Sequence, residues 1–310
     1  MPKTEPPMLG SLISIITSEL LTTKAVKFTE LAVVNKKVYV VESRPEEEGR
    51  CAVVDLDTGK DILPPPYSAK NGVHEYGGKT LCGDSETVYF THKKDHQIYS
   101  IQGGVVSKLT DRPNIRFAEP KIFKNFIFAI FEDHSDESNV KNGIMKISRE
   151  NGKCEIFESE HDFYAGVQIS PDNQHLAFFT WDFPNMPWDA ADVWKVDLSE
   201  TGEKISRKEI SPRGDISSSD PIFTQDGKLL YVSDHSGFWN IYNEDGSAVY
   251  KQDCDFTKPQ WKMSNSLYVD IGNSKIATVY TKNAADHLGI ISNGKLEEVD
   301  LPFTHYHTLV

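Results

Sequence analysis

Asp192-Val-Trp-Lys-Val-Asp-Leu-Ser-Glu-Thr-Gly202 is the stretch that decides the fold of this 310-residue chain. Apolar and polar residues alternate in its first half, as they do in a half-buried β-strand. Its second half is a polar turn that ends in glycine, the residue that most readily adopts the positive φ of a tight hairpin. The stretch therefore predicts a strand, a turn and the start of a second strand.

This hairpin element recurs along the chain. The copies span Cys51–Gly59, Gln97–Gly104, Gly143–Gly152, Asp192–Gly202, Asn240–Gly246 and Leu288–Gly294. Their closing glycines follow one another at intervals of 45, 48, 50, 44 and 48 residues. A period of about 40 to 50 residues that holds four short strands is typical of the blades of a β-propeller. Near-constant spacing favours this fold over an ordinary antiparallel sheet.

The fifth repeat contains a whole predicted blade, with strands over 221–224, 229–233, 238–242 and 248–251. We therefore predict an all-β fold, a propeller of four-stranded blades of about 45 residues. It would hold six hairpin repeats and, at Phe303–Val310, the start of a seventh. The expected domains are an arm or short helix over 1–25 and a propeller over 26–310 that is truncated at its C-terminus.

Composition narrows the function classes. The formal net charge of −13 disfavours nucleic acid as a partner, because phosphates would be repelled and no local basic stripe is present.

The cysteines at 51, 82, 154 and 254 are widely spaced, which predicts reduced thiols. The apolar run 8–21 is interrupted by serines and Glu19, so it suits neither a signal peptide nor a membrane span. The expected location is the cytoplasm.

Several motifs resemble one known family. Val73-His-Glu-Tyr-Gly-Gly78 is similar to the H-E-Y-G-G-G segment in the propeller of the prolyl oligopeptidase family of serine peptidases. Thr180-Trp-Asp-Phe-Pro-Asn-Met-Pro-Trp-Asp189 resembles W-D-H-P-N-M-P-W-D-G of its acylaminoacyl-peptidase-like and dipeptidyl-aminopeptidase-like branch. Ser43–Arg50, Val232–Tyr242 and Pro259-Gln-Trp261 fit the same family. The resemblance runs from near residue 10 to near residue 303 and so covers almost the whole chain. It implies a TolB-like propeller.

In that family the propeller precedes an α/β-hydrolase domain that carries the catalytic serine, aspartate and histidine. A nucleophile elbow needs the pattern G-x-S-x-G, because its serine sits on a sharp turn from strand to helix. Only Gly83-Asp-Ser85 and Gly272-Asn-Ser274 begin this pattern, and neither is completed by a second glycine. We therefore expect no catalytic residue in this chain and no hydrolase activity of the chain alone.

Four residues are candidate substrate contacts: Glu75, Arg116, Glu132 and Asp133. His74 and Glu75 are adjacent, so in a strand they would lie on opposite faces and at most one would face the central channel. Glu132 and Asp133 begin an acidic loop that also holds His134. In the aminopeptidases of the family, acidic propeller residues bind the α-ammonium group of the substrate, which a carboxylate pair does by charge-assisted hydrogen bonds. A solvated acidic surface is the alternative interpretation.

The sequence carries no metal or cofactor motif. The acidic loop lacks the spacing of an EF-hand. His305 and His307 are separated by one residue and have no third ligand near them in the sequence. We expect neither a cofactor nor a metal.

Two functions remain in competition. The first is a non-catalytic propeller that gates or filters the access of peptides to an active site on a hydrolase domain absent from this chain. The second is a stand-alone propeller that serves as a scaffold for protein interactions. A ring with a missing blade would also expose strand edges, which favours self-association. Neither nucleic acid nor membrane is an expected partner.

Overall fold

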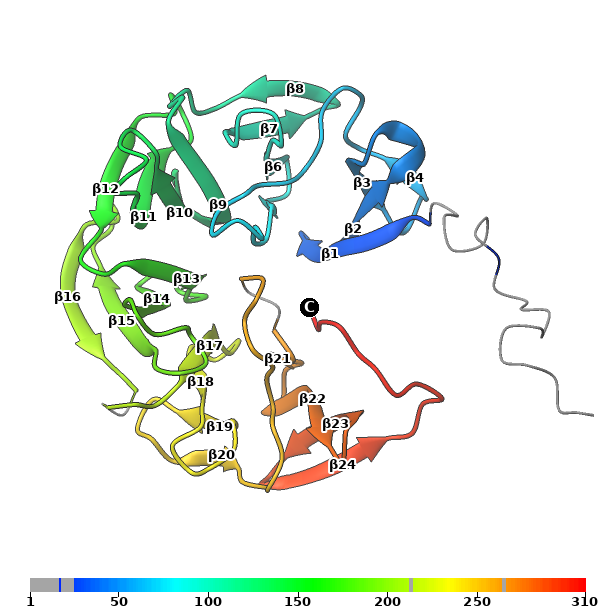
Figure 1. Cartoon of the computed structure of the whole chain (residues 1–310), viewed down its shortest axis with the longest axis vertical. Helices are drawn as coiled ribbons and strands as arrows, with labels where there is room; N and C mark the ends of the chain where they lie inside the picture. Colours follow the sequence, from blue (N-terminus) through cyan, green and yellow to red (C-terminus); the bar gives the residue numbers. More distant parts are fainter. Residues whose placement is uncertain (1–16, 18–24, 212–213, 264–265) are drawn as a thin grey trace, which may run out of the picture.

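The chain folds into a ring of six blades around a central axis (Figure 1). The computed structural model describes residues 17, 25–211, 214–263 and 266–310. Each blade is an antiparallel sheet of four strands that are hydrogen-bonded in sequence order. This confirms the predicted all-β propeller. The predicted arm, residues 1–25, lies outside the described residues apart from its positions 17 and 25.

The strands of each blade follow one another without a crossover. Those of blades 1 to 3 are β1 (Lys27–Val34), β2 (Lys37–Arg44), β3 (Arg50–Asp55), β4 (Lys60–Asp61), β5 (Leu81–Gly83), β6 (Thr87–Thr91), β7 (Ile98–Gln102), β8 (Val105–Lys108), β9 (Ile115–Phe123), β10 (Phe126–Asp133), β11 (Lys141–Ser148) and β12 (Cys154–Glu158). Those of blades 4 to 6 are β13 (Phe163–Ile169), β14 (His175–Trp181), β15 (Asp192–Leu198), β16 (Lys204–Glu209), β17 (Ser218–Phe223), β18 (Leu229–Ser233), β19 (Asn240–Asn243), β20 (Ala248–Tyr250), β21 (Tyr268–Asp270), β22 (Lys275–Lys282), β23 (Ala285–Ser292) and β24 (Lys295–Val299). A short 3-10 helix, η1 (Pro45–Glu47), is the one helix in the described part of the chain.

The six predicted hairpins form the third and fourth strands of the six blades. The turn of the β19–β20 hairpin shows why glycine closes it, since Gly246 has a φ of 81°. All four cysteines are free, as their spacing predicts.

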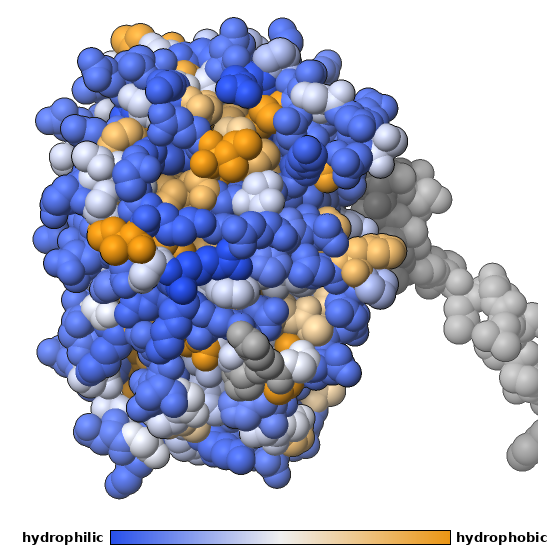
Figure 2. Space-filling view, turned by 90° about the vertical axis from the view of Figure 1, so that its left-hand side faces the viewer, coloured by the Kyte–Doolittle hydropathy of each residue, from blue (hydrophilic) through white to orange (hydrophobic). Residues whose placement is uncertain are grey.

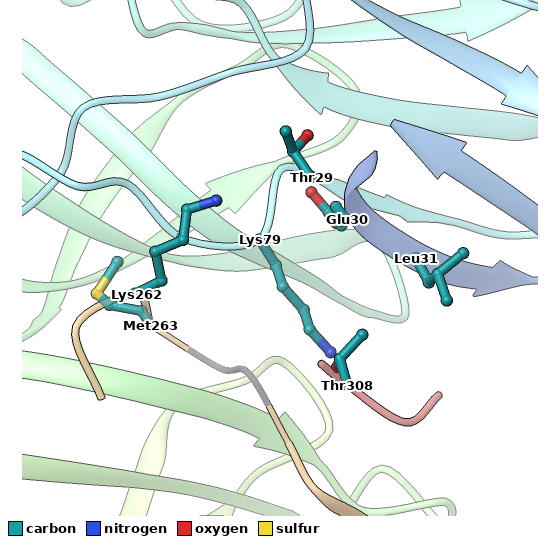
Figure 3. Close-up of a pocket in the computed structure, with 8 residues that line it drawn as sticks. Thr29, Glu30, Leu31, Lys79, Lys262, Met263 and Thr308 are labelled. Atoms are coloured by element: carbon teal, nitrogen blue, oxygen red, sulfur yellow. The ribbon is translucent and has the colours of Figure 1, made fainter. Parts of the chain in front are cut away.

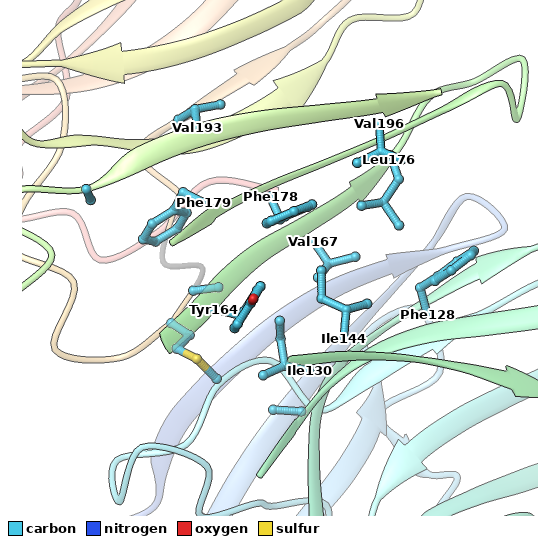
Figure 4. Packing of buried hydrophobic residues seen from close by; sticks show 14 of the residues in the cluster. Phe128, Ile130, Ile144, Tyr164, Val167, Leu176, Phe178, Phe179, Val193 and Val196 are labelled. Carbon is cyan, nitrogen blue, oxygen red and sulfur yellow. The ribbon is translucent and has the colours of Figure 1, made fainter. Parts of the chain in front are cut away.

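Neighbouring blades are held together by buried apolar clusters. The largest cluster joins blades 3, 4 and 5, with Phe128 and Ile144 facing Tyr164 and Val167 (Figure 4). Other clusters join blade 1 to blade 2, blade 2 to blade 3, and blade 5 to blade 6. Figure 2 shows that the side of the ring that carries β12 and β16 is mainly hydrophilic, with hydrophobic residues in small separate groups. The apolar side chains therefore gather between the blades.

The seam between blade 6 and blade 1 differs from the other junctions. Within the described residues, no buried apolar cluster joins these two blades. The predicted start of a seventh blade, Phe303–Val310, contains no strand. It runs back towards the middle of the ring (Figure 1), where the backbone N–H of Leu309 donates to the carbonyl of Ser266 at 2.9 Å.

Three carboxylates, which we call the channel carboxylates, connect alternate pairs of blades near the axis. Glu30 of β1 accepts hydrogen bonds from the backbone N–H and the hydroxyl of Thr80, both at 2.7 Å, next to blade 2. Glu119 of β9 accepts from the N–H groups of Gly166 (2.7 Å) and Val167 (3.3 Å) in blade 4.

Asp220 of β17 completes the set of channel carboxylates. It accepts from the hydroxyl of Thr257 at 2.6 Å and from the side-chain amide of Gln260 at 2.9 Å, ahead of blade 6. The inner strands bulge at all three carboxylates, and Glu119 and Asp220 have φ values of 52° and 51°. Each bulge turns a carboxylate towards the next blade, where it satisfies buried donors.

Candidate functional site

A groove of about 840 Å³ lies where connections from four parts of the ring meet. One side is formed by the turn ahead of β5 and by the β10–β11 connection. The other walls are the start of β13, the end of β14 with the loop that follows it, and the segment ahead of β21. In a propeller, such connections are free to vary while the blades hold them in place. The residues of the groove therefore lie mainly on connections that the blades hold in place and that are not required to form the blades.

Aromatic residues form one wall of the groove. Phe163 and Trp181 are stacked, with ring centroids 5.2 Å apart and planes 11° apart. Trp188 lies 4.7 Å from Trp261, which also contacts Tyr76 at 5.9 Å. These contacts bring together side chains from blades 2 and 4 and from the segment ahead of blade 6. The wall offers the flat apolar surface that apolar and aromatic ligands favour.

Acidic side chains lie along the rest of the groove. The carboxylate of Glu132 is buried and accepts a hydrogen bond from the backbone N–H of His74 at 2.6 Å. It also lies 3.1 Å from Nε2 of His134 and 3.8 Å from the guanidinium of Arg116. Glu75 lies 3.2 Å from the same guanidinium, but its side chain is 82% exposed. Glu75 is thus free to meet a ligand, whereas Glu132 holds the surrounding residues in place.

The structure brings together three of the four predicted contact residues, Glu75, Arg116 and Glu132. Arg116 and Glu132 are paired across β9 and β10. Asp133 follows Glu132 in the strand and so points to the other side. Its carboxylate accepts from the backbone N–H of Ser135 at 2.9 Å and does not line the groove.

The prediction that His74 and Glu75 lie on opposite faces of a strand is wrong, because this segment is a turn. The backbone N–H of Gly77 donates to the carbonyl of Val73 at 2.9 Å, which closes the turn. His74 and Glu75 have φ values of 50° and 64°, so both side chains line the groove. A turn with two consecutive residues of positive φ other than glycine is strained, and such strain gathers at functional sites.

The floor of the groove contains an uncharged histidine. The ring of His74 lies edge-on against Phe163 and Trp181, with centroids 5.3 Å and 5.4 Å away. Burial lowers the pKa of His74 to about 4, so the ring is neutral at pH 7. Within the described residues, neither of its buried ring nitrogens meets the distance and angle of a hydrogen bond, and nor does Oδ1 of Asn142. Asn142 still lies close enough to oppose the lowering of the pKa of the ring.

Asp162 is a groove residue that the sequence did not indicate. It is exposed, lines the groove, and accepts a hydrogen bond at 2.9 Å from the backbone N–H of Phe183. Its position on the groove depends on the long loop between β14 and β15, and no local motif marks it. Phe183 itself is 79% exposed, so this ring of the Thr180–Asp189 motif faces solvent and is not part of the blade packing.

Two smaller cavities share lining residues with the groove or with each other. Lys79, Glu30 and Met263 line a cavity of about 20 Å³, and the side chain of Lys79 extends towards Thr308 (Figure 3). Met263 also lines the groove, while Lys79 also lines a separate cavity of about 280 Å³.

The described residues contain no group of three or more His, Cys, Asp or Glu side chains that could hold a metal ion. Among the same residues, no helix is long and apolar enough to span a membrane.

Comparison with known proteins gives structural matches alone. No protein-family model and no curated protein sequence matches the chain. A puromycin hydrolase matches with a TM-score of 0.87 and 23% identity over 96% of this chain and 50% of that chain. A puromycin-hydrolyzing peptidase of Mycobacterium tuberculosis matches with a TM-score of 0.82 and 24% identity, over 92% of this chain and 48% of that one. This chain thus spans about half the length of both.

More distant structures share the same architecture. The acylaminoacyl peptidase of Pyrococcus horikoshii matches with a TM-score of 0.61 and 12% identity, over 89% of this chain and 46% of that chain. An oligogalacturonate lyase in complex with manganese matches with a TM-score of 0.60 and 14% identity, over 85% of this chain and 73% of that one. The matches confirm the predicted likeness to the propeller of acylaminoacyl-peptidase-like enzymes, at the level of the fold.

Proposed function

We propose that this propeller binds the amino end of peptides in its groove and gates their access to a serine peptidase active site on a hydrolase domain. The observation that carries the proposal is the composition of the groove, where an aromatic wall faces exposed carboxylates. An apolar side chain of the peptide would lie on Trp181 and Trp188. Its ammonium group would meet Glu75 and Asp162, because charge-assisted hydrogen bonds to carboxylates are the strong ones.

The matched structures support the pairing with a hydrolase domain. They are a puromycin hydrolase and peptidases, and this chain corresponds to about half of each. Peptides would reach the groove from its open side, and the loops around it would select them by size and by the charge of their end.

Glu75 is the carboxylate that is most suited to bind an ammonium group. Its side chain is 82% exposed and has one ion pair, with Arg116. Glu132 is only 7% exposed and already accepts from the backbone of His74, so a change there would disturb the turn as well as the ligand. The variant Glu75→Gln therefore separates binding from folding better than Glu132→Gln.

Fluorescence titration tests this proposal, because three tryptophans line the groove. The ligands are phenylalanylglycinamide, which has a free amine, and its N-acetylated form. The chain should bind the free amine more tightly, and Glu75→Gln should weaken that ligand about fivefold while leaving the acetylated one unchanged. Asp133→Asn is the matched control, because Asp133 does not line the groove. Equal affinity for both ligands in every variant would overturn the proposed recognition of the amine.

A further inference from the structure

His74 combines features that are costly to keep together in a folded protein. Its ring is buried between Phe163 and Trp181, and neither ring nitrogen has a hydrogen-bond partner within the described residues. A buried polar atom without a hydrogen-bond partner destabilises the folded state. A bond to the unpaired Oδ1 of Asn142 would satisfy one ring nitrogen and leave the other without a partner. The floor of the groove thus contains an unused hydrogen-bonding position.

The position of this ring is fixed by the backbone around it. The N–H of His74 donates to the buried carboxylate of Glu132 at 2.6 Å, and the N–H of Gly77 closes the turn on Val73. His74 is held at a φ of 50°, which costs free energy for a residue other than glycine. The ring is therefore preorganised, so a ligand would not have to order it on binding.

The chemistry of the ring restricts what it can recognise. A neutral imidazole has one N–H donor and one acceptor nitrogen. Because burial lowers its pKa to about 4, the ring carries no charge at pH 7 and does not add to the charge of the groove. A neutral donor-acceptor pair suits an amide group better than an ammonium or a carboxylate.

We propose that His74 is a specificity-determining residue that hydrogen-bonds to a main-chain amide of the peptide in the groove. This inference rests on the proposed function of the groove as a peptide site. The apolar side chain of the peptide would contact Phe163 and Trp181, and the adjoining amide would lie over the imidazole that these two rings enclose.

The experiment compares an amide with its ester. Phenylalanylglycinamide is titrated against the depsipeptide in which an ester oxygen replaces the inner N–H group. The ester lacks the N–H donor and has a weaker carbonyl acceptor. The hydrogen bond is therefore weakened whether the imidazole accepts from the amide N–H or donates to the amide carbonyl. The unmodified chain should bind the amide about tenfold more tightly than the ester. In His74→Phe, which keeps an aromatic ring but has no nitrogen, the two ligands should bind equally.

Two further variants complete the test. Phe163→Leu should weaken both ligands by the same factor, because it removes aromatic contact without touching the hydrogen bond. His74→Asn should restore part of the preference for the amide, since asparagine tolerates positive φ and keeps a donor and an acceptor. Circular dichroism confirms that each variant is folded.

The outcomes separate this inference from the proposal on which it rests. An amide preference that is the same in the unmodified chain and in His74→Phe would overturn the role of His74 and leave the peptide groove standing. A binding signal that Trp181→Leu does not change would place the ligand elsewhere and overturn both.

Discussion

Carboxylates line both the channel and the groove, and the two groups have different surroundings. Among the channel carboxylates Glu119 and Asp220 are buried and Glu30 is half-buried, and each accepts hydrogen bonds from the next blade. In the groove, Glu75 and Asp162 are exposed. Residue type alone does not separate the two groups. The hydrogen-bond donors around each carboxylate separate the two groups. A carboxylate that satisfies buried backbone N–H groups is structural, whereas an exposed carboxylate is available for a ligand.

The largest expected effect concerns the channel. Glu119→Ala leaves the buried N–H groups of Gly166 and Val167 without this acceptor, and each unsatisfied group costs about 1–3 kcal/mol. We expect Glu119→Ala to lower the free energy of unfolding by about 3 kcal/mol. Glu75→Ala should change it by less than about 0.5 kcal/mol, because exposed ion pairs contribute little. Urea unfolding of both variants measures the difference, and equal losses would remove the distinction between channel and groove.

A second prediction uses pH, because the channel and the groove each contain one buried group whose pKa is strongly shifted. Burial raises the pKa of Asp220 to about 6, from 3.8. Raising the pH through this window ionises the carboxyl in the unfolded chain first, so stability falls between about pH 4 and 6. His74 acts in the opposite direction. Burial lowers its pKa from 6.5 to about 4, so stability falls as the pH drops from about 6.5 to 4.

The two effects partly offset each other in the unmodified chain. The shifts correspond to at most about 3 kcal/mol for Asp220 and about 3.5 kcal/mol for His74, since one pKa unit is about 1.4 kcal/mol. Asp220→Asn should gain stability relative to the unmodified chain on going from pH 4.5 to pH 7. His74→Phe should gain on going from pH 7 to pH 4.5. Urea midpoints at the two pH values provide the readout, and the same pH dependence in all three proteins would mean that neither group titrates as described.

The smallest expected effect concerns the seam. We propose that the chain self-associates through the edge between blades 6 and 1, where the described residues form no buried apolar cluster. Phe28 of blade 1 and Phe303, which follows blade 6, are 68% and 61% exposed. Light scattering should show association that rises with concentration and falls when both residues are changed to Ser. Ile156 and Ile205, exposed apolar residues on β12 and β16, provide a matched double-Ser control. Monomers at all concentrations would contradict the proposal.

The sequence predicts the outer half of each blade better than the inner half. Six glycine-closed hairpins reveal the third and fourth strands, because strand alternation and turn glycines are local signals. The inner strands are harder to predict from the sequence, because bulges at Glu119 and Asp220 interrupt the alternation of apolar and polar residues. These bulges exist because a carboxylate must reach the neighbouring blade. That requirement comes from the packing of neighbouring blades in the ring, and no local sequence pattern marks it.

The same limit applies to the groove. The family resemblance and the acidic loop indicate Glu75 and Glu132, which are 57 residues apart. Asp133 shares the acidic signal, but strand alternation places it on the other side. Asn142 and Asp162 have no motif at all, and Trp261 reaches the groove through a long segment ahead of β21. Their positions follow from the closure of the ring, which brings blades 2, 3, 4 and 6 to one site.

The binding of a peptide in the groove can be tested most directly with the indole N–H signals of the five tryptophans in a nitrogen-15 NMR spectrum. Trp181, Trp188 and Trp261 line the groove, whereas Trp194 and Trp239 donate to Thr180 (2.8 Å) and Ser217 (3.1 Å) outside it. Addition of phenylalanylglycinamide should shift the first three signals and leave the other two in place. Shifts confined to Trp194 and Trp239, or no shift in any signal at saturating ligand, would contradict a peptide site in this groove.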